Sequence, residues 1–290
     1  MISKYSLALL ALGLVPATLP GQDSKDRVPQ QKKAALEAWG KLSAGEALQQ
    51  ETTHLILMTS KDQERKLKAL GTQLEKFYDQ ASKLLFTGKD EPWAGKLTVY
   101  LLGSGEQYDA FLRRVANRRP EEIEAGSFSA DDDRLYVVAC PPRGKDDPAL
   151  EIQAGMQIAS LLLQRKAGKS TPLPFWLLSG FGRATWYRAA PGMAVTRERR
   201  AALTVVQKNR RNASDVWTGG LENAELTLMH AAVADFLAYG PGKDKFLALL
   251  EGFKPEENVE RKTTEQALTA AGLKTETINP VFRRWLATVR

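Results

Sequence analysis

The chain has 290 residues, of which 43% are hydrophobic and 26% are charged, and its formal net charge at pH 7 is +7. These proportions are typical of a soluble globular protein and disfavour a disordered or fibrous chain, and the length allows one large domain or two small ones. The single cysteine, Cys140, excludes an intrachain disulfide, so the fold must depend on its apolar core. We expect Cys140, at the end of an apolar run, to be a small buried hydrophobe.

The first 21 residues have the pattern of a secretory signal peptide. Lys4 supplies a positive charge, residues 5–15 form an apolar run, and residues 16–21 contain proline and small residues. The apolar run is too short to span a bilayer as a helix, and no cysteine follows it that could carry a lipid anchor. The pattern predicts cleavage after Ala17 or Gly21, which would leave an exported protein, periplasmic or extracellular, without a transmembrane anchor.

The next part of the chain alternates between predicted helices and strands. Residues 22–35 are polar and predict a linker, so the segment 22–48 is expected to lie outside the main fold. Apolar periodicity and strand-forming residues predict further elements, namely strands at 52–58 and 96–102 and helices at 61–85 and 106–116. Two β-like runs, 125–129 and 134–140, flank an acidic turn and predict a hairpin.

The remainder of the chain is predicted to be helical. Helical patterns cover 148–163, 175–188, 222–239, 243–252, 264–271 and 279–289. This order predicts an α+β fold, in which a small mixed sheet with an edge hairpin packs on helices and a helical C-terminal part follows. We therefore expect an α+β subdomain at 49–190 and a helical subdomain at 191–290.

Basic residues gather at 113–119 and at 183–211. Such clusters can bind nucleic acid, anionic lipid or a cell-envelope polymer. No recognised nucleic-acid motif accompanies them, so we expect a solvated surface and no specific nucleic-acid partner. Weak polyanion binding through the second cluster is the alternative.

Several catalytic motifs can be excluded. The sequence Gly168-Lys169-Ser170 lacks the earlier glycine of a phosphate-binding loop and does not follow a strand. Ser179 lacks the flanking glycines of a nucleophile elbow. The only histidines, His54 and His230, have no local ligand spacing, so each is expected to be structural or at the surface.

The helix predicted at 148–163 contains an unexpected pair of amides. It is mostly apolar, yet Gln153 and Gln157 are four residues apart and therefore lie on one face. The two glutamines either mark a site or are simply the polar positions of an amphipathic helix.

The order of elements, together with the run LPFWLLSGFGRATW at 173–186, resembles the gluzincin metallopeptidases, in particular the secreted peptidase MA-like branch. In active relatives, the helix after the edge strand carries H-E-x-x-H, whose histidines hold zinc and whose glutamate is the general base. A second helix, similar to L-P-x-W-L-x-E-G-x-A, supplies a glutamate as the third ligand. The resemblance covers about residues 50–290 and implies a zincin-like fold.

Every chemical position departs from the family pattern. Gln153 and Gln157 stand at the histidine positions, Ala154 at the general base and Ser179 at the third ligand. A neutral amide is a poor zinc ligand, and alanine has no group that can take a proton. The resemblance therefore implies a pseudopeptidase with no catalytic residues, no metal and no cofactor.

A zincin-like fold without catalytic groups can still bind a peptide or protein. Gluzincins hold substrate backbone against an edge strand, and an edge strand can pair with a foreign strand without metal. The expected partner is an extended peptide or protein at the 125–140 hairpin, with Trp176 and His230 as possible neighbours in the cleft. Two alternatives stay open: a hydrolase that uses Ser179, His230 and the glutamines in the same cleft, and a polyanion-binding envelope protein.

Overall fold

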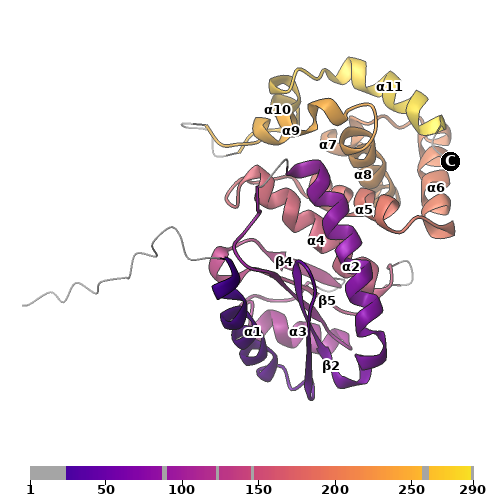
Figure 1. Ribbon diagram of the computed structural model, residues 1–290. Coiled ribbons are helices and arrows are strands. Elements are labelled where there is room, and N and C mark those ends of the chain that lie inside the picture. The colour runs from indigo at the N-terminus through magenta and orange to yellow at the C-terminus, as the bar shows by residue number, and fades with distance from the viewer. Residues whose placement is uncertain (1–23, 87–89, 122–123, 145–146, 257–260, 289–290) are drawn as a thin grey trace, which may run out of the picture.

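The computed structural model describes residues 24–86, 90–121, 124–144, 147–256 and 261–288, and the predicted signal peptide lies outside these ranges (Figure 1). A five-stranded mixed sheet lies between two layers of helices, and further helices continue beyond one of those layers (Figure 1). The sheet order is β1-β2-β3-β5-β4. The strands are β1 (Ala47–Glu51), β2 (Leu55–Ser60), β3 (Leu97–Leu101), β4 (Gly126–Ser129) and β5 (Tyr136–Ala139).

The helices account for most of the described chain. The helices that cover the two faces of the sheet are α1 (Ser24–Gly40), α2 (Glu64–Leu85), α3 (Gly105–Arg114) and α4 (Leu150–Ala167). The later helices are α5 (Phe175–Ala189), α6 (Met193–Lys208), α7 (Asp215–Thr218), α8 (Asn223–Ala238), α9 (Lys243–Gly252), α10 (Thr264–Ala270) and α11 (Thr275–Thr288). The expected small mixed sheet with helices is therefore confirmed.

The three central strands, β2, β3 and β5, are parallel, and an antiparallel strand closes each edge. All residues of the central strands are buried, as expected for strands covered by helices on both faces. Alternate residues of β2 point to opposite faces. Leu55 and Leu57 pack with α2 and α4, whereas Ile56 and Met58 pack with α1 and α3.

The predicted hairpin is confirmed, because β4 pairs antiparallel with β5 and lies at the edge of the sheet. The chain then passes directly into α4, which lies across the sheet next to α2 (Figure 1). The sequence therefore positions the helix with the two glutamines beside the free edge strand.

The linker expected at 22–35, and the wider segment 22–48, must be corrected. From Ser24 the chain forms α1, whose residues Ala35 and Trp39 are buried in the cluster on the second face of the sheet. The amide of Gln31 fixes this helix to the start of β3, since its Oε1 accepts a hydrogen bond from the backbone N–H of Lys96 at 3.0 Å. The polar composition hid these few apolar positions, which share one helix face.

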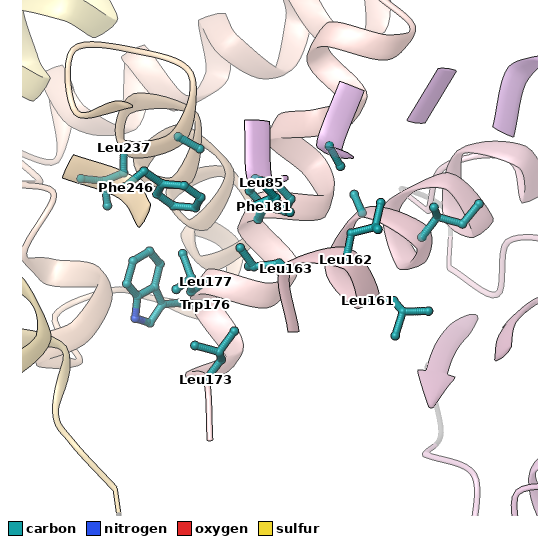
Figure 2. Close-up of a cluster of buried hydrophobic side chains, with 14 of the residues drawn as sticks. Leu85, Leu161, Leu162, Leu163, Leu173, Trp176, Leu177, Phe181, Leu237 and Phe246 are labelled. Carbon is teal, nitrogen blue, oxygen red and sulfur yellow. The ribbon is translucent and has the colours of Figure 1, made fainter. Parts of the chain in front are cut away.

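The parts expected at 49–190 and 191–290 share one core. Figure 2 shows Leu237 and Phe246, from α8 and α9, beside the α5 residues Leu177 and Phe181. The same buried cluster includes Leu55 of the sheet. No helix within the described ranges has both the length and the apolar character needed to cross a membrane.

Candidate functional site

The two glutamines lie on α4, a helix whose residues are almost all buried. The side chain of Gln153 is 8% exposed and that of Gln157 is half-buried. Neither amide has a hydrogen-bond partner among the residues that the structure describes. Neither amide is among the fully buried polar groups that lack a partner, so water can hydrogen-bond to both.

Gln157 lies against the edge strand. A Cβ atom placed on Gly126, the first residue of β4, would lie 3.0 Å from Cγ of Gln157 and 3.3 Å from its Nε2. Glycine therefore allows the strand backbone to approach this side chain closely. Gln157 is thus next to the edge strand.

Helices α4 and α5 cross at very short range. The hydroxyl of Ser160 lies 2.9 Å from the carbonyl oxygens of both Met156 and Leu178. A Cβ on Gly182 would lie only 2.7 Å from the carbonyl oxygen of Met156. These contacts fix Ser179, the residue after Leu178, relative to α4.

Two predicted site residues come together here. Oγ of Ser179 lies 3.4 Å from Nδ1 of His230 on α8 and donates to the carbonyl oxygen of Phe175 at 2.9 Å. The Phe175 side chain is 75% exposed, and its ring stands edge-on to the imidazole with a centroid distance of 6.2 Å. Gly180 permits this approach, because a Cβ atom there would lie only 2.3 Å from the carbonyl oxygen of His230.

This pair has only part of the arrangement of a catalytic triad. Burial lowers the pKa of His230 to about 4, so the imidazole is neutral near pH 7. The Ser179 hydroxyl also donates to the Phe175 carbonyl, and this bond competes with donation to the imidazole. Within the described part of the chain, no carboxylate orients His230, as a catalytic triad would require.

The other two expected residues belong to the core. The side chain of Ala154 is fully buried in the main cluster. Trp176 is also buried, and its Nε1 donates to Oγ1 of Thr264 at 3.1 Å while its ring packs against Trp217. Trp176 therefore joins α5 to α10 and is not a cleft residue.

Half of the basic residues in the second cluster, expected at the surface, form internal ion pairs. Four of its arginines bind carboxylates that are buried or half-buried: Arg183 pairs with Glu198, Arg188 and Arg199 pair with Asp235, and Arg211 pairs with Glu225. Arg197, Arg200, Lys208 and Arg210 remain exposed. The cluster expected to be a solvated surface is thus exposed in part and paired internally in part.

A group that the sequence analysis did not identify lies at the start of β2. There His54 meets two carboxylates of α2, Glu75 and Asp79. The two acidic residues are four apart and share a helix face, which was a detectable signal. Their proximity to His54 depends on how α2 packs on the sheet, and no local pattern reveals this.

Comparison with known proteins leaves the family open. No protein-family model matches the chain, and no curated protein matches it in sequence. What can be said of function therefore rests on the arrangement of these residues.

The neutral state of His230 predicts a pH-dependent stability. The histidine has an ordinary pKa of 6.5 in the unfolded chain and about 4 in the fold, so the unfolded chain takes up the proton first as the pH falls. The contribution of neutral His230 to the free energy of unfolding is fully present above pH 6.5. It should fall by about 1.4 kcal/mol per pH unit down to about pH 4. Urea unfolding across this range should show a smaller decline for His230→Gln, and parallel curves for the two proteins would contradict the prediction.

Proposed function

We propose that this protein is an exported, catalytically inactive relative of the gluzincin metallopeptidases that binds an extended peptide along β4. The proposal rests on an arrangement of elements similar to that of the family. An antiparallel edge strand is followed by β5 and then by two closely packed helices, α4 and α5. The observation that supports it most is the close approach of Gln157 to Gly126 of β4, since in this proposal Gln157 stands at a former ligand position.

The chemistry of the centre supports a loss of catalysis. The amides of Gln153 and Gln157 are neutral, and the Ala154 position is apolar and buried. Ser179 offers a hydroxyl that is already hydrogen-bonded to its own helix. Zinc in proteins is held by histidine, thiolate or carboxylate, and none of these stands at the four corresponding positions.

The free side of β4 can accept a strand. The backbone N–H of Cys140 donates to the carbonyl of Ala125 at 2.9 Å, which fixes the hydrogen-bonding phase of the antiparallel pair. In such a pair, bonded and non-bonded positions alternate, so the N–H and C=O groups of Gly126 and Phe128 point away from β5. These groups have no partner among the described residues and can pair with an incoming peptide.

If a peptide pairs with the free side of β4, Phe128→Pro should weaken its binding. Proline removes one outward N–H, and an edge strand tolerates it where the N–H faces solvent. The probe is the dodecapeptide most enriched from a random phage-displayed library on the mature protein. We expect Phe128→Pro to bind it at least about fivefold more weakly than the matched control Phe128→Ala, since a hydrogen bond contributes on the order of 1 kcal/mol.

The control variant removes the same aromatic side chain but keeps the N–H, so the difference between the two variants isolates the backbone contribution. Circular dichroism should confirm that both variants are folded. Equal affinities for both variants, or a library that yields no enriched peptide, would overturn the edge-binding hypothesis.

A hydrolase remains the second candidate, because Ser179 and His230 lie 3.4 Å apart. It predicts cleavage of unfolded protein substrates that is lost in Ser179→Ala and unaffected by chelator. The pseudopeptidase hypothesis predicts no cleavage by either protein. Activity that chelator removes would contradict both.

A further inference from the structure

We propose that His54, Glu75 and Asp79 form a binding site for a divalent transition-metal ion such as Zn²⁺. His54 immediately precedes β2, and the two carboxylates are on α2. Phe77, which packs against Gly155 of α4, lies on the opposite face of α2 from these carboxylates. The site is therefore separate from the glutamine pair and does not depend on the proposed function.

The three side chains converge at distances suited to one ion. Nδ1 of His54 lies 2.7 Å from Oε2 of Glu75 and 3.9 Å from Oδ1 of Asp79, and one ligand atom from each residue lies within 4.8 Å of the others. Ligands that bind one zinc ion at about 2.0–2.2 Å are separated by roughly 3–3.5 Å. Shifts of about 1 Å in these separations therefore convert the observed cluster into a coordination set.

Two of these side chains are held in place before any ion arrives. The His54 ring stacks on Tyr78, with centroids 4.1 Å apart and an interplanar angle of 12°. The Oε1 atom of Glu75 accepts the backbone N–H of His54 at 2.8 Å and the hydroxyl of Thr52. Pre-oriented ligands lose less conformational entropy on binding.

The hydrogen bonds by which Glu75 fixes the turn at 52–54 do not explain why Asp79 lies beside the same histidine. Glu75 alone would suffice to fix the turn at 52–54, and its Oε1 already does so. The Asp79 side chain is 67% exposed, yet it approaches the same imidazole nitrogen as Oε2 of Glu75. A second carboxylate at this nitrogen is what a cation site requires.

The negative charge of the cluster is not neutralised by neighbouring cations. Among the described residues, no lysine or arginine lies within ion-pair distance of Glu75 or Asp79, and Lys96 pairs with Glu51 instead. The pKa of Tyr78 reflects this field, since burial raises it and the charges of Glu75, Glu91 and Asp79 raise it further. A bound cation would relieve this repulsion.

The ligand set selects the class of metal. One imidazole nitrogen with two carboxylate oxygens suits Zn²⁺, Co²⁺ or Ni²⁺, whereas Ca²⁺ and Mg²⁺ prefer oxygen ligands only. The half-exposed His54 and the exposed Asp79 leave the solvent side open, so water can complete the coordination shell.

The chain provides its own matched control, because it has only two histidines. Tag-free full-length protein is stripped with chelator and titrated with Zn²⁺ in a calorimeter and with Co²⁺ by visible absorption. We expect one ion per chain in the wild type and in His230→Ala. His54→Ala and Asp79→Asn should each bind at least about tenfold more weakly.

Asp79→Asn keeps the size of an exposed side chain, so the test holds even if His54→Ala folds poorly. The proposal is overturned if the wild type shows no saturable binding of either ion. It is equally overturned if His230→Ala weakens binding while Asp79→Asn leaves it unchanged, since the ion would then be at the α5–α8 contact.

Discussion

Replacing Asp235 with alanine should lower the free energy of unfolding by about 3–5 kcal/mol, the usual cost of removing one partner from a buried ion pair. The carboxylate is 1% exposed and pairs with Nη2 of Arg188 at 2.6 Å and Nη2 of Arg199 at 3.0 Å. The Nε atoms of both arginines are already buried without a partner. The network therefore has no spare acceptor, and the variant leaves two guanidinium groups uncompensated.

The measurement is urea unfolding of the full chain, followed by circular dichroism. Asp133→Ala is the matched control, because Asp133 is exposed and has no ion-pair partner among the described residues. That control should change stability by less than about 0.5 kcal/mol. A loss below about 1 kcal/mol for Asp235→Ala would show that water already solvates the arginines.

Gly180→Ala should destabilise the protein by about 3 kcal/mol, at the upper end of ordinary overpacking. The added Cβ would lie 2.3 Å from the carbonyl oxygen of His230 and 2.7 Å from its carbonyl carbon. Both are backbone atoms of α8, so no side-chain rotation relieves the clash. The two helices must move apart, which also separates Ser179 from His230.

Gly40→Ala tests whether the effect is specific to this helix contact. Gly40 ends α1, and a Cβ there would meet nothing within 4 Å. This control should be neutral or stabilising by up to about 1 kcal/mol, since alanine reduces the freedom of the unfolded chain. Thermal unfolding should therefore separate the two variants clearly, and equal melting temperatures would contradict the close contact of α5 and α8.

Elements with a strong local pattern could be predicted from the sequence. The long helix α2 and the hairpin of β4 and β5 were predicted close to their observed bounds, because periodicity and turn residues are local signals. Strand β1 was missed, since its sequence ALQQE is polar and becomes a strand only by pairing with β2. The strand expected from Thr52 begins at Leu55, because residues 52–54 form the turn that Glu75 holds.

The geometry of the candidate sites could likewise be predicted only where it depends on local sequence. The shared face of Gln153 and Gln157 follows from helix geometry, whereas the position of Gln157 beside β4 depends on how α4 packs on the sheet. The pairing of Arg188 with Asp235 joins residues 47 positions apart. No local pattern indicates which charges of a basic cluster will be buried, so the sequence could not show which basic residues at 183–211 are solvated, as expected, and which form internal ion pairs.

The short length of β4 affects how readily the protein aggregates at high concentration. Long, flat edge strands template aggregation, but β4 has only four residues. Its end is tied down by Arg165, which donates to the carbonyl of Ala130 and to Asp132. At the opposite edge, Glu51 of β1 forms ion pairs with Lys32 and Lys96. Both margins of the sheet thus resist fibril growth, while in the proposed function the outward groups of β4 pair with a single peptide.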